Sequence, residues 1–131
     1  MEIQRDSYLK QLISYRFDGL VKVITGIRRC GKSYLLKKLY KDYLLNHHVK
    51  EEQIISIELD LAKDIQFRDP LRLSSFVREK LSGTTEEHYL FIDEIQMSDE
   101  VPNPYNPEGK KISFYDALND LRSITNLDVY V

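Results

Sequence analysis

Hydrophobic and polar residues follow two periods in turn along this chain, and this alternation predicts strands separated by helices. Apolar runs, or strict alternation of apolar and polar residues, predict four strands at 21–25, 54–60, 88–94 and 127–131. Apolar residues three and four positions apart predict helices over 6–13, 34–44, 70–81 and 114–121. Strands that alternate with helices indicate an α/β fold, a three-layer α/β/α sandwich with a mainly parallel sheet.

Local signals define the starts of two of these helices. Asp69 is placed to cap the helix over 70–81, with Pro70 at its first position, and Ser82-Gly83 would end it. Ser113 and Asp116 form a capping pair before the helix over 114–121. The residues expected on the inner sides of the two helices are Leu73, Phe76, Val77 and Leu81, and Phe114, Leu118 and Leu121.

Two other predicted elements each have one apolar face. Alternation points Ile55, Ile57 and Leu59 inward, which is typical of a strand at the edge of a sheet. The helix over 34–44 carries its lysines on the side opposite its apolar residues, and we interpret Lys37, Lys38 and Lys41 as a solvated face. Its expected apolar side consists of Leu35, Leu36, Leu39, Tyr40, Tyr43 and Leu44.

The stretch 97–112 is the least regular part of the sequence. It holds three of the four prolines of the chain, which predicts a loop. A loop of this length is either a contact surface near the catalytic edge or an ordinary surface insertion. The sequence leaves both interpretations open.

The most specific chemical signal lies at 26–33, which fits the phosphate-binding pattern G-x-x-x-x-G-K-[ST], the Walker A motif, at every fixed position. Because the motif stands between a predicted strand and a predicted helix, its backbone N–H groups and the helix N-terminus would surround a phosphate. Lys32 would contact the β- and γ-phosphates, and the Ser33 hydroxyl would be a ligand of Mg²⁺. The predicted nucleotide-binding residues are Gly26, Ile27, Arg28, Arg29, Cys30, Gly31, Lys32, Ser33 and Tyr34.

A second motif supports this interpretation against an ordinary glycine-rich turn. The apolar run 88–92 ends in Asp93 and Glu94, as expected for a buried strand whose carboxyl end opens into a ligand crevice. Asp93 would hold the Mg²⁺ shell, and Glu94 would orient and deprotonate the water that attacks the γ-phosphate. Glu94 and Lys32 are therefore the predicted catalytic residues. Alone, the two carboxylates are equally consistent with a solvated strand end.

Composition narrows the function classes. The chain has 131 residues, 42% hydrophobic and 31% charged, with a net charge of −2, so it resembles a globular protein without a general basic field for nucleic acid. Its apolar runs are too short to span a membrane. A single cysteine fits a reducing compartment, so we expect a cytoplasmic protein. Cys30 is either a small loop residue or a redox switch on nucleotide binding.

The segments 23–33 and 91–96, followed by 118–121 and 128–131, resemble a group of AAA-superfamily P-loop ATPases from bacteria and archaea. These proteins usually carry a C-terminal nuclease-like domain of unknown role. The resemblance implies a Mg²⁺-dependent ATPase with ATP and Mg²⁺ as cofactors. It also implies the strand order 5-1-4-3-2, with 54–60 as the second strand at the edge.

The resemblance further implies that residues 1–131 are a partial ATPase domain. In that family a polar sensor residue, a fifth strand, an arginine finger and a helical lid would follow. We therefore expect very slow hydrolysis by this fragment and self-association through its uncovered edge. A nucleic-acid or protein substrate would be reached only through the missing C-terminal part, and what hydrolysis drives lies outside the sequence.

Two alternatives remain at this point. One is a nucleotide-binding fragment without significant turnover. The other is a different P-loop NTPase or a kinase. A GTPase is disfavoured by the lack of an Asn-Lys-x-Asp signature, and a kinase by a glutamate directly after the Mg²⁺ aspartate.

Overall fold

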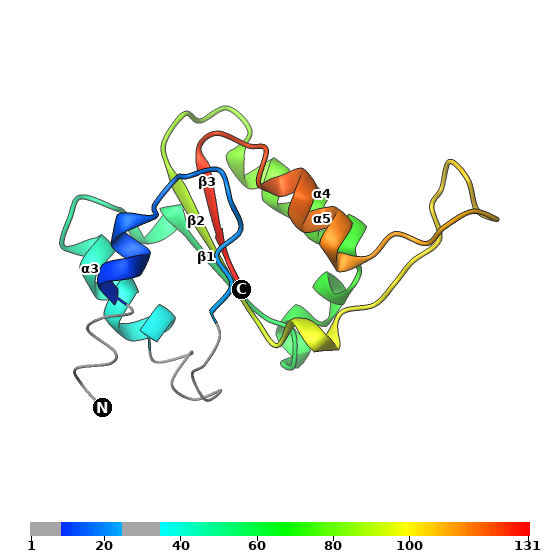
Figure 1. The fold of residues 1–131 in the computed structure, drawn as a ribbon, viewed down its shortest axis with the longest axis horizontal. Coiled ribbons are helices and arrows are strands. Elements are labelled where there is room, and N and C mark those ends of the chain that lie inside the picture. Colours follow the sequence, from blue (N-terminus) through cyan, green and yellow to red (C-terminus); the bar gives the residue numbers. More distant parts are fainter. Residues whose placement is uncertain (1–8, 25–34) are drawn as a thin grey trace.

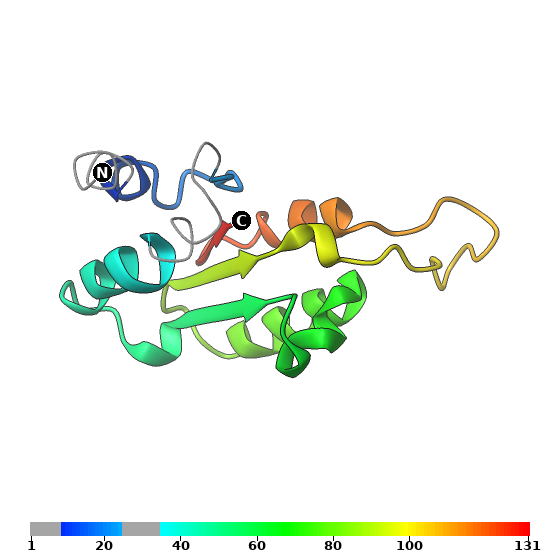
Figure 2. The ribbon, with the colours of Figure 1, turned by 90° about the horizontal axis from the view of Figure 1, so that it is seen from below.

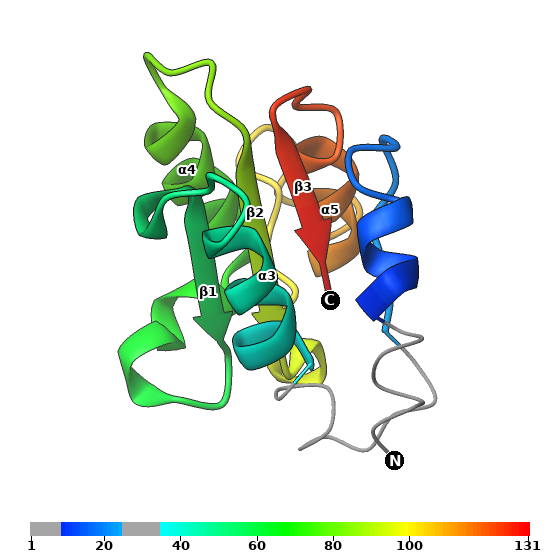
Figure 3. The same cartoon turned by 90° about the vertical axis from the view of Figure 1, so that its left-hand side faces the viewer.

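A three-stranded parallel sheet forms the centre of the computed structural model, which describes residues 9–24 and 35–131. The strands β1 (Ile54–Glu58), β2 (His88–Asp93) and β3 (Leu127–Tyr130) lie in the order β1-β2-β3. Ile57 stands opposite Ile92, and Leu90 stands opposite Val129. Figure 3 shows the three arrows pointing the same way, so the predicted parallel α/β sheet is confirmed.

Residues 21–24 extend this sheet beside β3. The Lys22 N–H donates to the Val129 carbonyl at 2.9 Å, and the Val131 N–H donates back to the Lys22 carbonyl at 2.8 Å. The Ile24 N–H donates to the Val131 carbonyl at 2.9 Å. The segment thus runs parallel to β3, but it forms one isolated bridge instead of the full strand predicted over 21–25. Thr25 lies outside the described residues.

Helices cover both faces of the sheet (Figure 1). The helices α4 (Pro70–Leu81) and α5 (Phe114–Leu121) pack on one face. The opposite face carries helical residues 9–14, the π-helix η1 (Leu35–Tyr40) and α3 (Lys41–Leu45), which continues η1 directly. Short 3₁₀ helices lie between these elements at η2 (Glu51–Gln53), η3 (Ala62–Arg68) and η4 (Ile95–Met97).

The pleat of the strands divides the core into two clusters of different character. On the α4/α5 side the side chains are almost entirely aliphatic, and Leu90 and Ile92 of β2 are fully buried there. On the η1/α3 side the intervening residues Tyr89 and Phe91 pack with Tyr40 and Tyr130. One strand therefore supplies two cores, because successive side chains point to opposite faces.

The predicted caps of α4 and α5 are confirmed. Asp69 Oδ1 accepts the Leu71 N–H at 2.9 Å, with Pro70 in the first turn. Ser113 and Asp116 form a reciprocal capping box at the start of α5. The inner side of α4 differs from the prediction at one position, because Phe76 is only half-buried. It packs against Phe67 of η3, with ring centroids 4.6 Å apart and the rings tilted by 39°, at the border of a surface groove.

The helix after residue 34 differs from the prediction in two ways. It starts as a π-helix, and of its expected apolar residues Leu36, Tyr40 and Leu44 are buried, while Leu39 and Tyr43 are half-buried. The side chain of Leu35 lies outside the described residues.

The lysines predicted on a solvated face of this helix are exposed or partly exposed, and each forms an ion pair. Lys37 forms an ion pair with Glu58 at the end of β1, and Lys41 pairs with Glu51 of η2 at 2.5 Å. Neither partner is near in sequence, which is why the pattern along the helix does not reveal these pairs. Lys38 pairs within the helix with Asp42 at 3.5 Å.

The predicted loop over 97–112 projects from the domain, and backbone hydrogen bonds join its two ends. Val101 and Ile112 exchange backbone hydrogen bonds of 3.0 and 2.8 Å, and beyond them the chain extends away from the sheet (Figure 2). Tyr105 in this loop is 96% exposed. Across the ranges 9–24 and 35–131, no helix has the length and apolar character needed to cross a membrane.

Candidate functional site

The predicted Mg²⁺ ligand Asp93 is the last residue of β2, at the carboxyl edge of the sheet. It is half-buried and stands opposite Glu58, the last residue of β1. Because the strands are parallel, the carboxyl ends of β1, β2 and β3 meet at this edge, where open α/β sheets bind ligands. The structure therefore places Asp93 where the sequence predicts it, at the end of a strand whose other residues are all buried.

Glu94, the predicted base, follows β2 in a left-handed backbone conformation with φ 63° and ψ 49°. Its N–H donates to Asp93 Oδ1 at 3.0 Å, which ties the Asp93 carboxylate to the backbone of the next residue. Gln96 Nε2 donates to Glu94 Oε2 at 2.5 Å. Left-handed residues other than glycine are strained by about 1–2 kcal/mol and occur preferentially at functional sites. The sequence gives no signal for this turn.

Asp93 also lies beside the helix that follows the phosphate motif. A small cavity there is lined by Leu36 and Lys37 of η1, by Asp93, and by their neighbours on β1 and β2, Ser56, Ile57, Phe91 and Ile92. Its volume of about 10 Å³ admits at most one water molecule, so it is a packing defect under the helix and not a nucleotide pocket. Its lining nevertheless places the first turn of η1 next to the end of β2.

The phosphate motif itself lies outside the described residues, so the roles predicted for its members stay predictions. These members are Gly26, Ile27, Arg28, Arg29, Cys30, Gly31, Lys32, Ser33 and Tyr34. Both flanks of the motif are described. Ile24 bonds to Val131 just past the end of β3, and Leu36 lies beside Asp93. The chain thus enters and leaves the motif at the carboxyl edge of the sheet.

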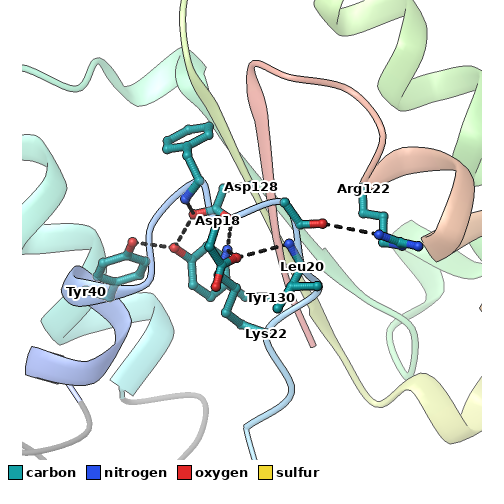
Figure 4. A network of polar contacts seen from close by, with 9 residues as sticks. Asp18, Leu20, Lys22, Tyr40, Arg122, Asp128 and Tyr130 are labelled. Carbon is teal, nitrogen blue, oxygen red and sulfur yellow. Dashed lines mark hydrogen bonds and ion pairs between the residues drawn. The ribbon is translucent and has the colours of Figure 1, made fainter.

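A buried polar network connects these flanks, and the sequence analysis does not identify it (Figure 4). Asp128 of β3 is 2% exposed and bonds to Lys22 at 2.5 Å, to the Phe17 N–H at 3.0 Å and to the Tyr130 hydroxyl at 2.6 Å. The Tyr40 hydroxyl of η1 lies 2.5 Å from that of Tyr130. An aspartate inside an apolar strand is the signal that points to such a network, because a buried charge requires partners.

Charge and burial define the protonation of this network. Burial raises the pKa of both Tyr130 and Tyr40 far above the ordinary tyrosine value, so both hydroxyls stay protonated. Lys22 also pairs with Asp18 at 2.6 Å. Partial burial opposes ionisation of Asp18, but hydrogen bonds from Lys22 and from the Leu20 N–H outweigh it and lower the pKa of Asp18.

Residues 18–105 match the model of the AAA domain family. The chain belongs to this family. The matched range begins at Asp18, includes β1 and β2 with Asp93 and Glu94, and ends in the projecting loop. Family membership indicates a nucleotide-binding module of the ATPase type.

One relative of this AAA domain is an uncharacterized protein from Haemophilus influenzae, 36% identical over 94 residues. The alignment covers 72% of this chain and 23% of the relative, so the chain spans about a quarter of the length of the curated relative it matches. No solved structure matches the chain. In the described part of the AAA domain, His, Cys, Asp and Glu side chains do not gather in threes as a metal-binding group.

Proposed function

We propose that this AAA domain binds ATP with Mg²⁺ and hydrolyses it as the motor module of a longer protein. One observation carries the proposal: Asp93 and Glu94 lie at the sheet edge where the chain enters and leaves the phosphate motif. In this arrangement the backbone of 26–34 and Lys32 hold the phosphates, which are the predicted contacts of the motif.

The residues around Asp93 suit a hard cation. Carboxylate and hydroxyl oxygens are the ligands that Mg²⁺ prefers, and Ser33 and Asp93 would supply one of each, directly or through water. Bound Mg²⁺ would neutralise charge on the β- and γ-phosphates. Asp93 is held in place from its own turn, since it accepts the Glu94 N–H at 3.0 Å.

Glu94 is the residue proposed to take a proton from the attacking water. A general base has to keep one orientation relative to the reacting atom. The left-handed turn directs the chain sharply out of β2 at this residue, and the Gln96 amide holds one carboxylate oxygen. Both features restrict the carboxylate of Glu94. The alternative is an AAA domain that binds nucleotide without significant turnover.

The longer protein is part of the proposal. We propose that it adds the sensor residue, a fifth strand in the order 5-1-4-3-2, an arginine finger, a lid and a nuclease-like C-terminal domain, and that it works in the cytoplasm, where ATP is present. Residues 1–131 alone would then hydrolyse ATP very slowly. Self-association is supported by Leu20 and Val23, which are 60% and 63% exposed beside the segment that borders β3.

The decisive experiment for hydrolysis is Glu94→Gln in the longer protein. The change keeps the shape of the side chain but removes the base, so MgATP binding should persist while kcat falls about 100-fold or more. Glu87→Gln is the matched control, because Glu87 is an exposed glutamate just before β2, at the opposite end of the strand. Parental turnover in Glu94→Gln would assign the base to another residue. Nucleotide binding without turnover in the parent would favour the alternative.

A further inference from the structure

The network around Asp128 touches both flanks of the phosphate motif. Before the motif, Lys22 bonds to Asp128 Oδ1 through its ammonium group and to Val129 through its N–H. After the motif, Tyr40 closes the π-helix η1 and reaches Tyr130 through its hydroxyl. The two flanks therefore meet on one strand, β3, at residues that follow one another along its polar side.

The direction of each hydrogen bond is determined by the groups present. Tyr130 donates its only proton to the Asp128 carboxylate at 2.6 Å, so Tyr40 has to be the donor in the contact between the two hydroxyls. Lys22 donates to Asp128 from the other side. The result is a directed chain from Tyr40 through Tyr130 to Asp128, which Lys22 completes. A chain of this kind has one low-energy arrangement.

Stability alone does not account for this network. Apolar residues of similar volume often stabilise a core as well as a buried ion pair does, because desolvation offsets the attraction of the charges. The other face of the same strands is built in that way, with Leu90, Ile92 and Val129 fully or almost fully buried. The buried pair of Lys22 and Asp128 stands where the flanks of the motif meet.

We propose that Asp128 and Tyr130 are positioning residues for nucleotide binding, which fix the entry and the exit of the phosphate motif relative to each other. The inference rests on the proposed function. Residues that orient the ligands of a metal typically contribute about 10–100-fold to metal affinity, and we take this as the scale for a supporting residue here. We expect the lower end here, about tenfold, because Tyr130 acts through the backbone flanks and not on a ligand.

The test compares two Tyr→Phe variants of the same chain. Tyr130→Phe removes the hydroxyl that joins Tyr40 to Asp128. Tyr89→Phe is the matched control, because Tyr89 is 1% exposed, lies on the same face and bonds through its hydroxyl to Arg16, which is not part of the network. Equilibrium titration with a fluorescent ATP analogue and Mg²⁺, well below each melting temperature, gives Kd. Hydrogen exchange of the amides in 25–34 gives a second readout that needs no nucleotide.

We expect Tyr130→Phe to weaken binding about tenfold and to speed exchange in 25–34, while Tyr89→Phe keeps the parental Kd and exchange. Equal Kd values for both variants and equal exchange would overturn the inference, even if Tyr130→Phe unfolds at a lower temperature. If the parent itself binds no nucleotide, the proposed function fails, and exchange alone decides on the positioning role. If Tyr130→Phe does not fold, Tyr40→Phe, which removes only the outer hydroxyl, takes its place with the same expected outcomes.

Discussion

The two faces of the sheet use the same strands but different chemistry. Toward α4 and α5, the core is aliphatic, and Leu73, Val77 and Leu90 are fully buried. Toward η1 and α3, the core is rich in aromatic residues, and the ion pair of Lys22 and Asp128 lies beside it. Alternate residues of β2 and β3 supply each face, so a single strand serves both.

The two faces therefore contribute differently to the protein: one mainly stabilises the fold, and the other mainly fixes how its residues are arranged. Aliphatic packing is non-directional and scales with the area removed from water, so its main effect is to stabilise the fold. Hydrogen bonds between charged and hydroxyl groups are directional and hold their partners in one arrangement. The face with the hydrogen-bonded network lies beneath η1, the helix that follows the phosphate motif. A nucleotide site needs fixed geometry there. The aliphatic face carries the helices α4 and α5, on the opposite side of the sheet from η1.

The largest expected effect comes from breaking the buried ion pair. Lys22→Met leaves the Asp128 carboxylate, 2% exposed, without its cation, which should lower the free energy of unfolding by about 3–5 kcal/mol. Leu73→Ala on the aliphatic face should lower it by about 2–5 kcal/mol through cavity formation. Urea unfolding measures both. Only Lys22→Met should also weaken binding of an ATP analogue.

Either of two results would contradict the proposed difference between the two faces of the sheet. One is a loss of less than about 1 kcal/mol in Lys22→Met, the value of an exposed ion pair. The other is the same change in nucleotide affinity for Lys22→Met and Leu73→Ala.

A smaller effect is expected from the surface pair that joins α4 to α5. Arg78 donates two hydrogen bonds of 2.7 and 3.1 Å to Asp120, and these lower the pKa of Asp120 below its ordinary value. Both side chains are about half exposed, so Asp120→Asn should cost only about 0.2–1 kcal/mol.

The pH dependence of this pair has a definite sign. A carboxyl group whose pKa is lowered by folding stabilises the fold above its unfolded pKa of about 3.9, and this contribution disappears as the pH falls through the folded pKa. The difference between parent and Asp120→Asn should therefore be complete at pH 7 and shrink below about pH 4. A difference that grows toward low pH would contradict the assignment. Glu79→Gln, on the exposed side of α4, is the control.

Local sequence signals predicted the parts of the fold that depend on near neighbours. The Asp69 cap and the Ser113 capping box act within three residues, and the alternation of Ile55, Ile57 and Leu59 follows from one buried face. The placement of Asp93 follows from the same logic, because a fully buried strand has to end at a polar edge.

Features that depend on distant partners were not predicted. The pair of Lys37 with Glu58 and the network of Asp128 join segments far apart in the chain, so no periodicity encodes them. The left-handed backbone of Glu94 and the π-helix η1 are also invisible to periodicity, which assumes regular elements. Both occur next to the predicted site, where local rules are most often broken.

Binding of nucleotide by the phosphate motif is tested by the variant Lys32→Ala. Loss of a charge-assisted contact of about 1.5–3 kcal/mol should raise the Kd of a fluorescent ATP analogue with Mg²⁺ by about one to two powers of ten. Lys38→Ala is the control, because the Lys38 side chain is 64% exposed and pairs with Asp42 one turn further along. We expect a parental Kd for Lys38→Ala and a Kd raised 10- to 100-fold for Lys32→Ala. Equal affinities of Lys32→Ala and the parent would contradict this expectation.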